Sequence, residues 1–72
     1  MSELPITRWA KLTPGEFRVA RLAATTSLRD HEIAAQLNIG MGAVKNRMSA
    51  AFGKLGVRNR PQLIWETGAI LQ

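Results

Sequence analysis

The chain has 72 residues, 46% of them hydrophobic, and a formal net charge of +5, a length that suits one small domain and is too short for a deep catalytic cleft. With no cysteine and a single histidine, the sequence excludes a disulfide framework and a protein-only zinc site. Because it also lacks a signal peptide and a long apolar run, we expect a cytoplasmic protein with no cofactor, no metal, no membrane partner and no small-molecule substrate.

The charged residues are unevenly placed along the chain. The first 32 residues are nearly balanced in charge, but no acidic residue lies between Glu32 and Glu66. The basic residues in that interval are Lys45, Arg47, Lys54, Arg58 and Arg60. This distribution is typical of a surface that meets phosphates. The solvated surface of a basic protein is the simpler alternative.

Residues 1–11 contain a proline and show no clear hydrophobic period. We therefore predict an N-terminal arm over residues 1–11, followed by one domain over residues 12–72. Trp9 is expected to anchor the arm on this domain rather than to bind a ligand, because an indole buries a large apolar area.

The first helix is predicted over residues 14–24. Thr13 suits its N-cap, Pro14 suits its first position, and Glu16 is placed to close a capping box. Apolar side chains recur at helical spacing and predict its buried stripe, formed by Val19, Leu22 and Ala23.

A short second helix is predicted over residues 29–37. Asp30 and Glu32 lie in its first turn, where the helix dipole favours negative charge. The side chains expected to face inward are Ile33, Ala34 and Leu37. The turn that follows contains Asn38 and Gly40, which both tolerate unusual backbone angles.

The third helix is predicted over residues 41–55. An advance of about 100° per residue separates two sides of this helix. The core side comprises Val44, Met48, Ala51 and Leu55, with Phe52 beside them. The opposite side comprises Gly42, Lys45, Asn46, Ser49 and Gly53, whereas Arg47 and Lys54 fall on a flank. The glycines on the exposed side allow a partner to approach the backbone closely while a few side chains contact it.

The fourth helix is predicted over residues 60–70. Gly56 suits the C-terminal cap of the preceding helix, Asn59 an N-cap and Pro61 a first turn. One face is expected to comprise Leu63, Ile64, Thr67, Ile70 and Leu71, and the other Gln62, Trp65, Glu66 and Ala69. A large aromatic on the second face normally marks a contact with a partner. The alternative is that Trp65 packs over the arm and Trp9.

The second and third helices, joined by a turn, form a helix-turn-helix pattern. The segments LTPGEFRVARLA and EIAAQLNIGMGAVKNRMSAAFGKLGVRNRPQLI resemble the LuxR/GerE-type DNA-binding domain over about residues 12–65. The resemblance implies an all-α, four-helix domain that binds double-stranded DNA and dimerises through its fourth helix. From these 72 residues we expect the free-standing type within the family, and the alternative is a domain excised from a longer protein.

The resemblance also implies roles for single residues. The positions that match base-contacting ones are Lys45, Asn46 and Ser49. Arg47, which stands where many members have histidine, and Arg58 match positions that contact the DNA backbone. Lys54 and Arg60 are added to the backbone set because they flank the same surface. The expected dimerisation residues are Gln62, Trp65, Glu66 and Ala69.

Four residues depart from the family pattern. Gly40 and Arg29 replace serine caps, Met41 replaces an acidic residue, and Ala43 replaces a threonine. Each lost cap is expected to cost about 1 kcal/mol of helix stability. The lost threonine hydroxyl removes a phosphate contact, so the departures weaken the expected affinity more than the fold.

The leading hypothesis is a dimeric, sequence-specific transcription regulator of bacterial type, associated with the nucleoid, with RNA polymerase or a related regulator as a further partner. A second hypothesis is a small protein that pairs through its fourth helix with a related regulator and keeps it off DNA. The lost caps and the expected exposure of Trp65 and Phe17 motivate it. A third is a promoter-recognising domain like that of sigma factors, which the ending KLGVRNR disfavours. An enzyme is disfavoured because consecutive Asp30, His31 and Glu32 point in different directions.

Overall fold

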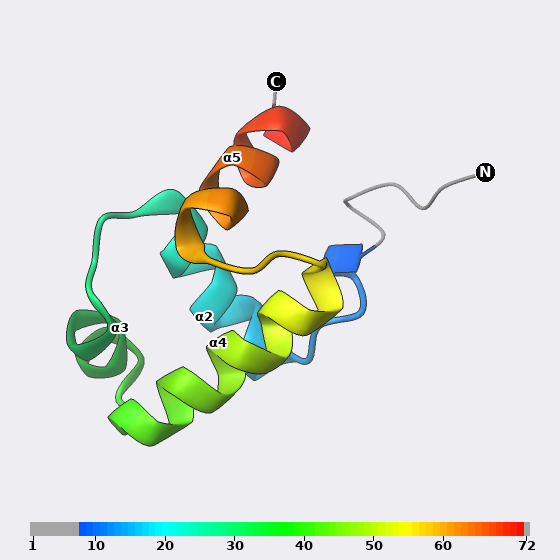
Figure 1. The fold of residues 1–72 in the computed structure, drawn as a ribbon. Coiled ribbons are helices and arrows are strands. Elements are labelled where there is room, and N and C mark those ends of the chain that lie inside the picture. The colour runs from blue at the N-terminus through cyan, green and yellow to red at the C-terminus, as the bar shows by residue number, and fades with distance from the viewer. Residues whose placement is uncertain (1–7, 72) are drawn as a thin grey trace.

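The computed structural model describes residues 8–71, with side chains described as far as Thr67. After a short helical turn at Arg8 and Trp9, the chain forms α2 (Pro14–Thr25), α3 (Asp30–Leu37), α4 (Met41–Leu55) and α5 (Arg60–Leu71). Helix α2 packs against each of the other three, and α3 also packs against α4 (Figure 1). Residues 8–71 contain no strand, and none of their helices is long and apolar enough to cross a membrane. The predicted all-α, four-helix fold is confirmed.

The capping signals explain why α2 begins where it does. Thr13 Oγ1 accepts a hydrogen bond from the Glu16 N–H at 3.2 Å, and the Thr13 N–H donates to Glu16 Oε1 at 3.0 Å. This reciprocal pair is the predicted capping box, and it satisfies two backbone donors that the helix leaves without partners. The helix ends one residue later than predicted, at Thr25.

Helix α3 begins at Asp30 because Arg29 adopts an extended conformation as its N-cap. The Arg29 side chain makes no cap hydrogen bond, but its backbone N–H donates to Glu32 Oε1 at 2.8 Å. Glu32 thus makes the second bond of a capping box, to the N-cap N–H, while the bond from the N-cap side chain is missing. In the following turn Asn38 has a left-handed backbone with φ 56°, as predicted. Gly40 has an ordinary extended backbone, with φ −78° and ψ 162°, which any residue can adopt.

Helix α5 is capped by Asn59, whose Oδ1 accepts a hydrogen bond from the Gln62 N–H at 2.8 Å. Leu63 is buried in the core, but Ile64, which was predicted to share a face with it, is 44% exposed. The reason is that α5 packs substantially only against α2. One neighbour covers a narrow stripe, and Ile64 lies about 100° around the axis from Leu63. The side chains of Ile70 and Leu71 lie outside the described residues.

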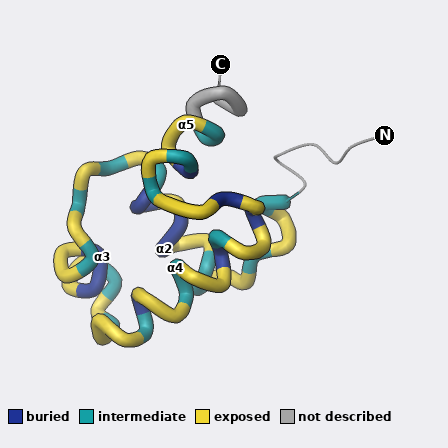
Figure 2. The backbone as a smooth tube through the Cα atoms, in the orientation of Figure 1, coloured by how far each residue is buried: buried dark blue, intermediate teal, exposed yellow. Residues whose placement is uncertain are grey.

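The core lies where α2, α3 and α4 meet (Figure 2). Its buried members are Val19, Ala20, Leu22, Ala23, Ile33, Ala34, Val44, Ala51, Leu55, Val57 and Leu63. Most were predicted from helical spacing, although Ala20 and Val57 were not. Trp9 packs partly buried against this core and meets Phe17 edge-on, with ring centroids 5.7 Å apart. The described end of the predicted arm is therefore anchored through Trp9, as expected.

Candidate nucleic-acid interface

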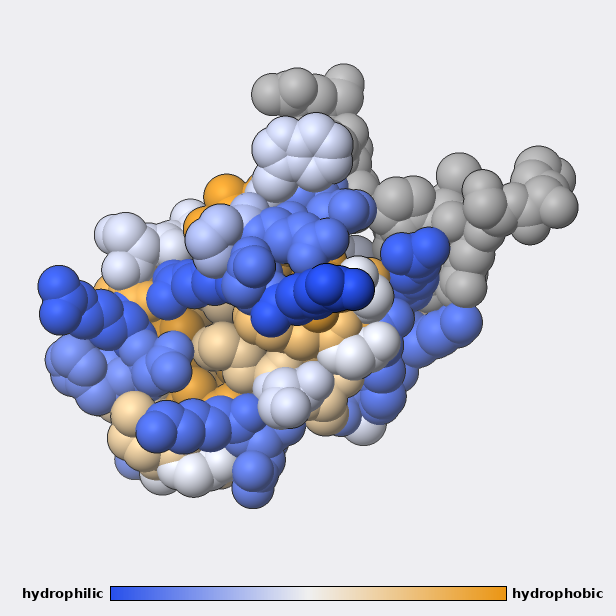
Figure 3. Space-filling model, viewed as in Figure 1, coloured by the Kyte–Doolittle hydropathy of each residue, from blue (hydrophilic) through white to orange (hydrophobic). Residues whose placement is uncertain are grey.

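The side of α4 opposite the core is open to solvent. Its residues are all exposed, as predicted: Gly42, Lys45, Asn46, Ser49 and Gly53. A Cβ built at Gly42 or Gly53 would meet no atom within 4 Å. Figure 3 shows hydrophilic side chains predominating on a face of the molecule that includes α4. The surface therefore combines an amine, an amide and a hydroxyl with backbone that a partner can approach.

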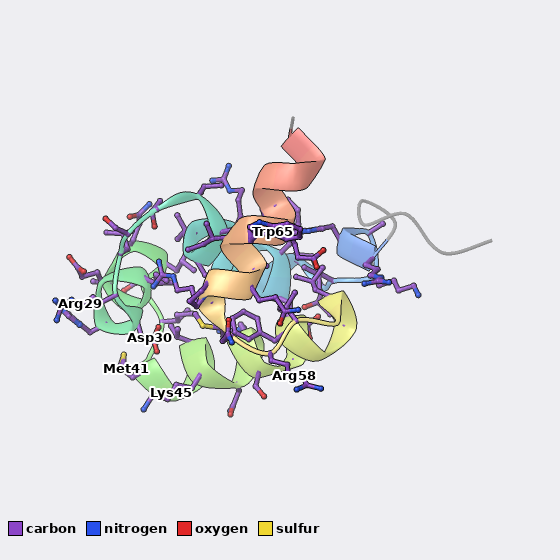
Figure 4. All side chains as sticks on the ribbon, turned by 45° about the horizontal axis from the view of Figure 1, so that its top comes forward. Arg29, Asp30, Met41, Lys45, Arg58 and Trp65 are labelled. Atoms are coloured by element: carbon purple, nitrogen blue, oxygen red, sulfur yellow. The ribbon has the colours of Figure 1, made fainter. Side chains whose placement is uncertain are left out.

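The N-terminal end of α4 has no side-chain cap. Gly40 is its N-cap and makes no side-chain hydrogen bond, and the first turn contains no acidic residue. Neither a capping side chain nor an acidic residue within the first turn of α4 therefore compensates the helix dipole, a state that favours anions. Met41, the first residue of the helix, is 39% exposed. In Figure 4 Met41, Lys45 and Arg58 lie along one edge of the molecule.

The C-terminal end of α4 is joined to the rest of the domain. Arg8 Nη1 donates a hydrogen bond to the Leu55 carbonyl at 3.3 Å, and Gly56 ends the helix with φ 73°. Lys54 Nζ lies 2.7 Å from Glu16 Oε1 in the first turn of α2. The Lys54 ammonium, helped by the Thr13 N–H, lowers the pKa of Glu16 below its ordinary value. Lys54, predicted to contact DNA, thus has an acidic partner within the domain.

Arg47 lies between α4 and the first turn of α2 and is half-buried. A Cβ at Gly15 would stand 2.8 Å from Arg47 Nε, so the guanidinium occupies the space that a side chain at position 15 would need. Its Nη1 atom is buried without a hydrogen-bond partner in the structure. A small hollow beside it is lined by Gly15, Arg18, Leu37, Ile39 and Arg47. Packing therefore restricts how far Arg47 can reach toward a partner.

The two remaining basic residues of the predicted backbone set differ in their surroundings. Arg58 is exposed in the turn before α5. Arg60 instead donates from Nε to the Ala23 carbonyl at 2.9 Å and from Nη2 to the Thr26 carbonyl at 2.8 Å. It binds the carbonyls at the C-terminal end of α2, where cations and donors are favoured. The sequence contains no local signal for this pairing, because the partners lie 37 and 34 residues away.

Trp65 projects from α5 and is 72% exposed (Figure 4). Because Trp9 instead packs on Phe17, the alternative in which Trp65 packs over Trp9 is wrong. Gln62 and Glu66 are half-exposed on the same helix, and the Gln62 side chain accepts a hydrogen bond from the Arg58 N–H at 2.9 Å. The Ala69 side chain lies outside the described residues.

A short α3 followed by an α4 with an open, polar face is the arrangement of helix-turn-helix domains, a class in which the second helix commonly contacts the major groove of DNA. The family model for bacterial regulatory proteins of the luxR family, GerE, matches residues 10–67. The chain belongs to this family. No curated protein and no solved structure gave a significant match.

Membership in the luxR family establishes the general activity. This luxR-family chain carries a DNA-binding helix-turn-helix domain of the kind that regulates transcription. The matched residues include all of α2, α3 and α4 and the first part of α5. The match assigns no role to individual side chains, so the base, backbone and dimer contacts stay predictions.

Proposed function

We propose that this luxR-family protein binds specific sequences in double-stranded DNA as a homodimer, with α4 in the major groove. The observation that carries the proposal is the open side of α4, where Lys45, Asn46 and Ser49 are exposed together. Lys45 donates to guanine N7 and O6, Asn46 pairs with adenine N6 and N7, and Ser49 accommodates either base. Such residues distinguish base pairs in the major groove, whereas a merely basic surface does not.

The phosphate contacts of the proposal come from residues around this open side. Arg58 is exposed on the same edge as Lys45 (Figure 4), which suits contact with the DNA backbone. Lys54 and Arg47 contribute positive charge from the flank, and Lys54 then shares its ammonium between Glu16 and a phosphate. Arg60 is assigned to the fold rather than to DNA, because two of its donors bind carbonyls of α2 and the loop after it.

The dimer of the proposal forms through the outer face of α5. A single short recognition helix contacts only a few base pairs, so useful specificity needs two half-sites. A self-complementary pair of helices is the simplest symmetric way to present two recognition helices. Trp65 supplies the apolar centre, and Gln62, Glu66 and Ala69 surround it. Because one helix buries a small area, we expect dimerisation mainly on DNA.

We place the protein in the cytoplasm on the nucleoid, with RNA polymerase or a related regulator as a further partner. The second candidate function, in which the chain pairs with a related regulator and keeps it off DNA, uses the same exposed Trp65. The two functions differ in whether the purified chain binds DNA by itself.

Selection from random duplex DNA tests the proposal. The expected result is one enriched motif present as two half-sites at a fixed spacing. Trp65→Ala should lower cooperativity on the two-half-site duplex and leave binding to a single half-site and the helical circular dichroism signal nearly unchanged. Ile64→Ala, at an exposed apolar residue of the same helix that is not among the proposed dimer residues, is the matched control.

Three results would contradict parts of the proposal. Equal recovery of all sequences would reject specific binding. No DNA binding, together with loss of DNA binding by a related full-length regulator on mixing, would favour the inhibitor. Unfolding of Trp65→Ala would show that Trp65 supports the fold rather than a dimer.

A further inference from the structure

Met41 is an apolar side chain that the fold does not explain. It is 39% exposed, and it belongs neither to the buried core nor to the partly buried residues packed against that core. Met48, on the same helix, does belong to the packed group. A single exposed apolar residue is common on protein surfaces, so a role for Met41 depends on its place beside the side chains proposed to contact bases.

The position of Met41 leaves its side chain accessible. It is the first residue of α4, and both of its chain neighbours are glycines, at which an added Cβ would meet nothing within 4 Å. The first turns of α2 and α3 contain acidic residues, whereas those of α4 and α5 contain none. The family pattern has an acidic residue at this position, which favours the helix by its charge, whereas the neutral Met41 brings an apolar group to this helix end and no charge that repels phosphates.

The geometry relates Met41 to Lys45. Residues four apart on a helix are separated by about 40° around the axis and by about 6 Å along it. Both side chains lie at the same edge of the molecule (Figure 4). Since base pairs are stacked about 3.4 Å apart, the two side chains would meet base pairs about two steps apart.

In the major groove the apolar group that bases display is the C5 methyl of thymine, and apolar side chains contact it. We infer that Met41 is a specificity-determining residue that contacts a thymine methyl within two base pairs of the base bound by Lys45. This inference rests on the proposed function, since it requires α4 in the major groove. According to this inference, Met41 provides a preference for thymine over the other bases. Lys45, Asn46 and Ser49 do not provide that preference.

Deoxyuridine provides a direct test, because it differs from thymidine only by the missing methyl group. In the duplex selected by the native protein, each thymine is replaced singly by deoxyuridine and the dissociation constant is measured. The Lys45→Ala variant identifies the base that Lys45 contacts, because its specificity is relaxed at that position. Within two base pairs of that position, we expect one replacement to weaken binding about fourfold, which is the effect of burying one methyl group. Met41→Leu should keep this thymine preference, and Met41→Gln, of similar length but polar, should abolish it.

The comparison of thymine with deoxyuridine is made within each variant, so a change in fold stability or in overall affinity cancels. The inference is overturned if the selected motif has no thymine in this window, if no replacement there weakens binding, or if Met41→Gln keeps the full preference. A native protein that binds all duplexes equally would reject the proposed function itself, and with it this inference. Specific binding without a methyl effect would reject the inference alone.

Discussion

The two ends of α4 are built in opposite ways. At the C-terminal end, Gly56 closes the helix, Arg8 binds the Leu55 carbonyl, and Lys54 pairs with Glu16 of α2. At the N-terminal end, Gly40 makes no side-chain cap, and the first turn has no acidic residue. One end is therefore attached to the domain by side chains from other segments, whereas the other end presents backbone and side chains to solvent.

This difference shows how a small domain separates stability from recognition. The hydrogen bond of Arg8 and the Gly56 cap at the C-terminal end of α4 leave open the side that we propose contacts DNA. The N-terminal end loses some helix stability without a cap, but its positive dipole and open backbone remain available to anions. Substitutions at the two ends should therefore affect different measurements.

The largest expected effect is on binding at the open side. Lys45→Ala and Asn46→Ala should each remove about 1–3 kcal/mol of discrimination between specific and non-specific DNA. Their free energies of unfolding should hardly change, because both side chains are exposed. Dissociation constants on the selected duplex and on a scrambled duplex measure the difference. Arg58→Ala is the matched control, since loss of a phosphate contact should weaken both complexes equally and lower the salt slope by about one.

If Lys45→Ala or Asn46→Ala weakened both duplexes equally, that residue would belong with the phosphate contacts. An unchanged salt slope in Arg58→Ala would remove Arg58 from the backbone set.

A smaller effect, on stability, is expected at the attached end. Gly56→Ala forces a side chain into the left-handed region and should lower the free energy of unfolding by about 1–2 kcal/mol. The added Cβ would also stand 3.2 Å from Arg8 Nη1, close to the hydrogen bond with Leu55. Urea unfolding measures the loss. The matched control is Gly53→Ala, which lies within α4 with open space around it and should stabilise the protein by about 1 kcal/mol.

Similar stabilities of Gly56→Ala and Gly53→Ala would contradict the attachment of this end through the Gly56 cap. A Gly53→Ala variant that is more stable but binds DNA more weakly would show that this glycine allows close approach of the backbone.

Restoring a cap at the open end is expected to change stability by a few tenths of a kcal/mol, less than the sequence-based expectation of about 1 kcal/mol, because glycine is itself an acceptable N-cap. Gly40 has an extended backbone and free space around it. In the Gly40→Ser variant the introduced hydroxyl should therefore accept a hydrogen bond from the Ala43 N–H and stabilise α4 slightly. Gly40→Asp should cap similarly but weaken DNA binding at low salt, because its carboxylate lies near phosphates. Thermal unfolding and binding at two salt concentrations measure both effects. Equal DNA affinity of the two variants would show that this end does not face the backbone.

The smallest effect is expected from the Lys54–Glu16 pair, because it is partly exposed and screened by salt. The pKa of Glu16 is lowered by Lys54 and by the Thr13 N–H, so the folded state favours its ionised form. This contribution to stability is complete above the unfolded pKa of about 4.3 and is lost as the pH falls through the lower folded pKa. Glu16→Gln should flatten the decline of the free energy of unfolding below that pH.

Urea unfolding from neutral to acid pH, at low and high salt, measures this decline. The control is Lys54→Met, which removes the main cause of the lowered pKa and should also reduce the decline. If the free energy of unfolding fell as steeply with pH in Glu16→Gln as in the native protein, the acid sensitivity would belong to other carboxylates.

Local signals account for the parts of the fold that the sequence predicted well. Thr13 with Glu16, Asn59 before Pro61, and Gly56 after Leu55 act on backbone groups within a few residues, so their hydrogen bonds are visible in the order of residues alone. Helical spacing likewise predicted the exposed side of α4 and the buried stripe of α2, because the period of the helix is the same in every context.

The sequence by itself determined the four helices, their caps and the face of α4 that meets solvent, because these depend on neighbours along the chain. Only the tertiary structure decided which cations are already paired: Arg60 with carbonyls 37 and 34 residues away, and Lys54 with a carboxylate 38 residues away. It also decided that Arg47 fills the space over Gly15 and that Ile64 stays exposed. These outcomes depend on which helix packs beside which, and no spacing within one helix specifies its neighbour.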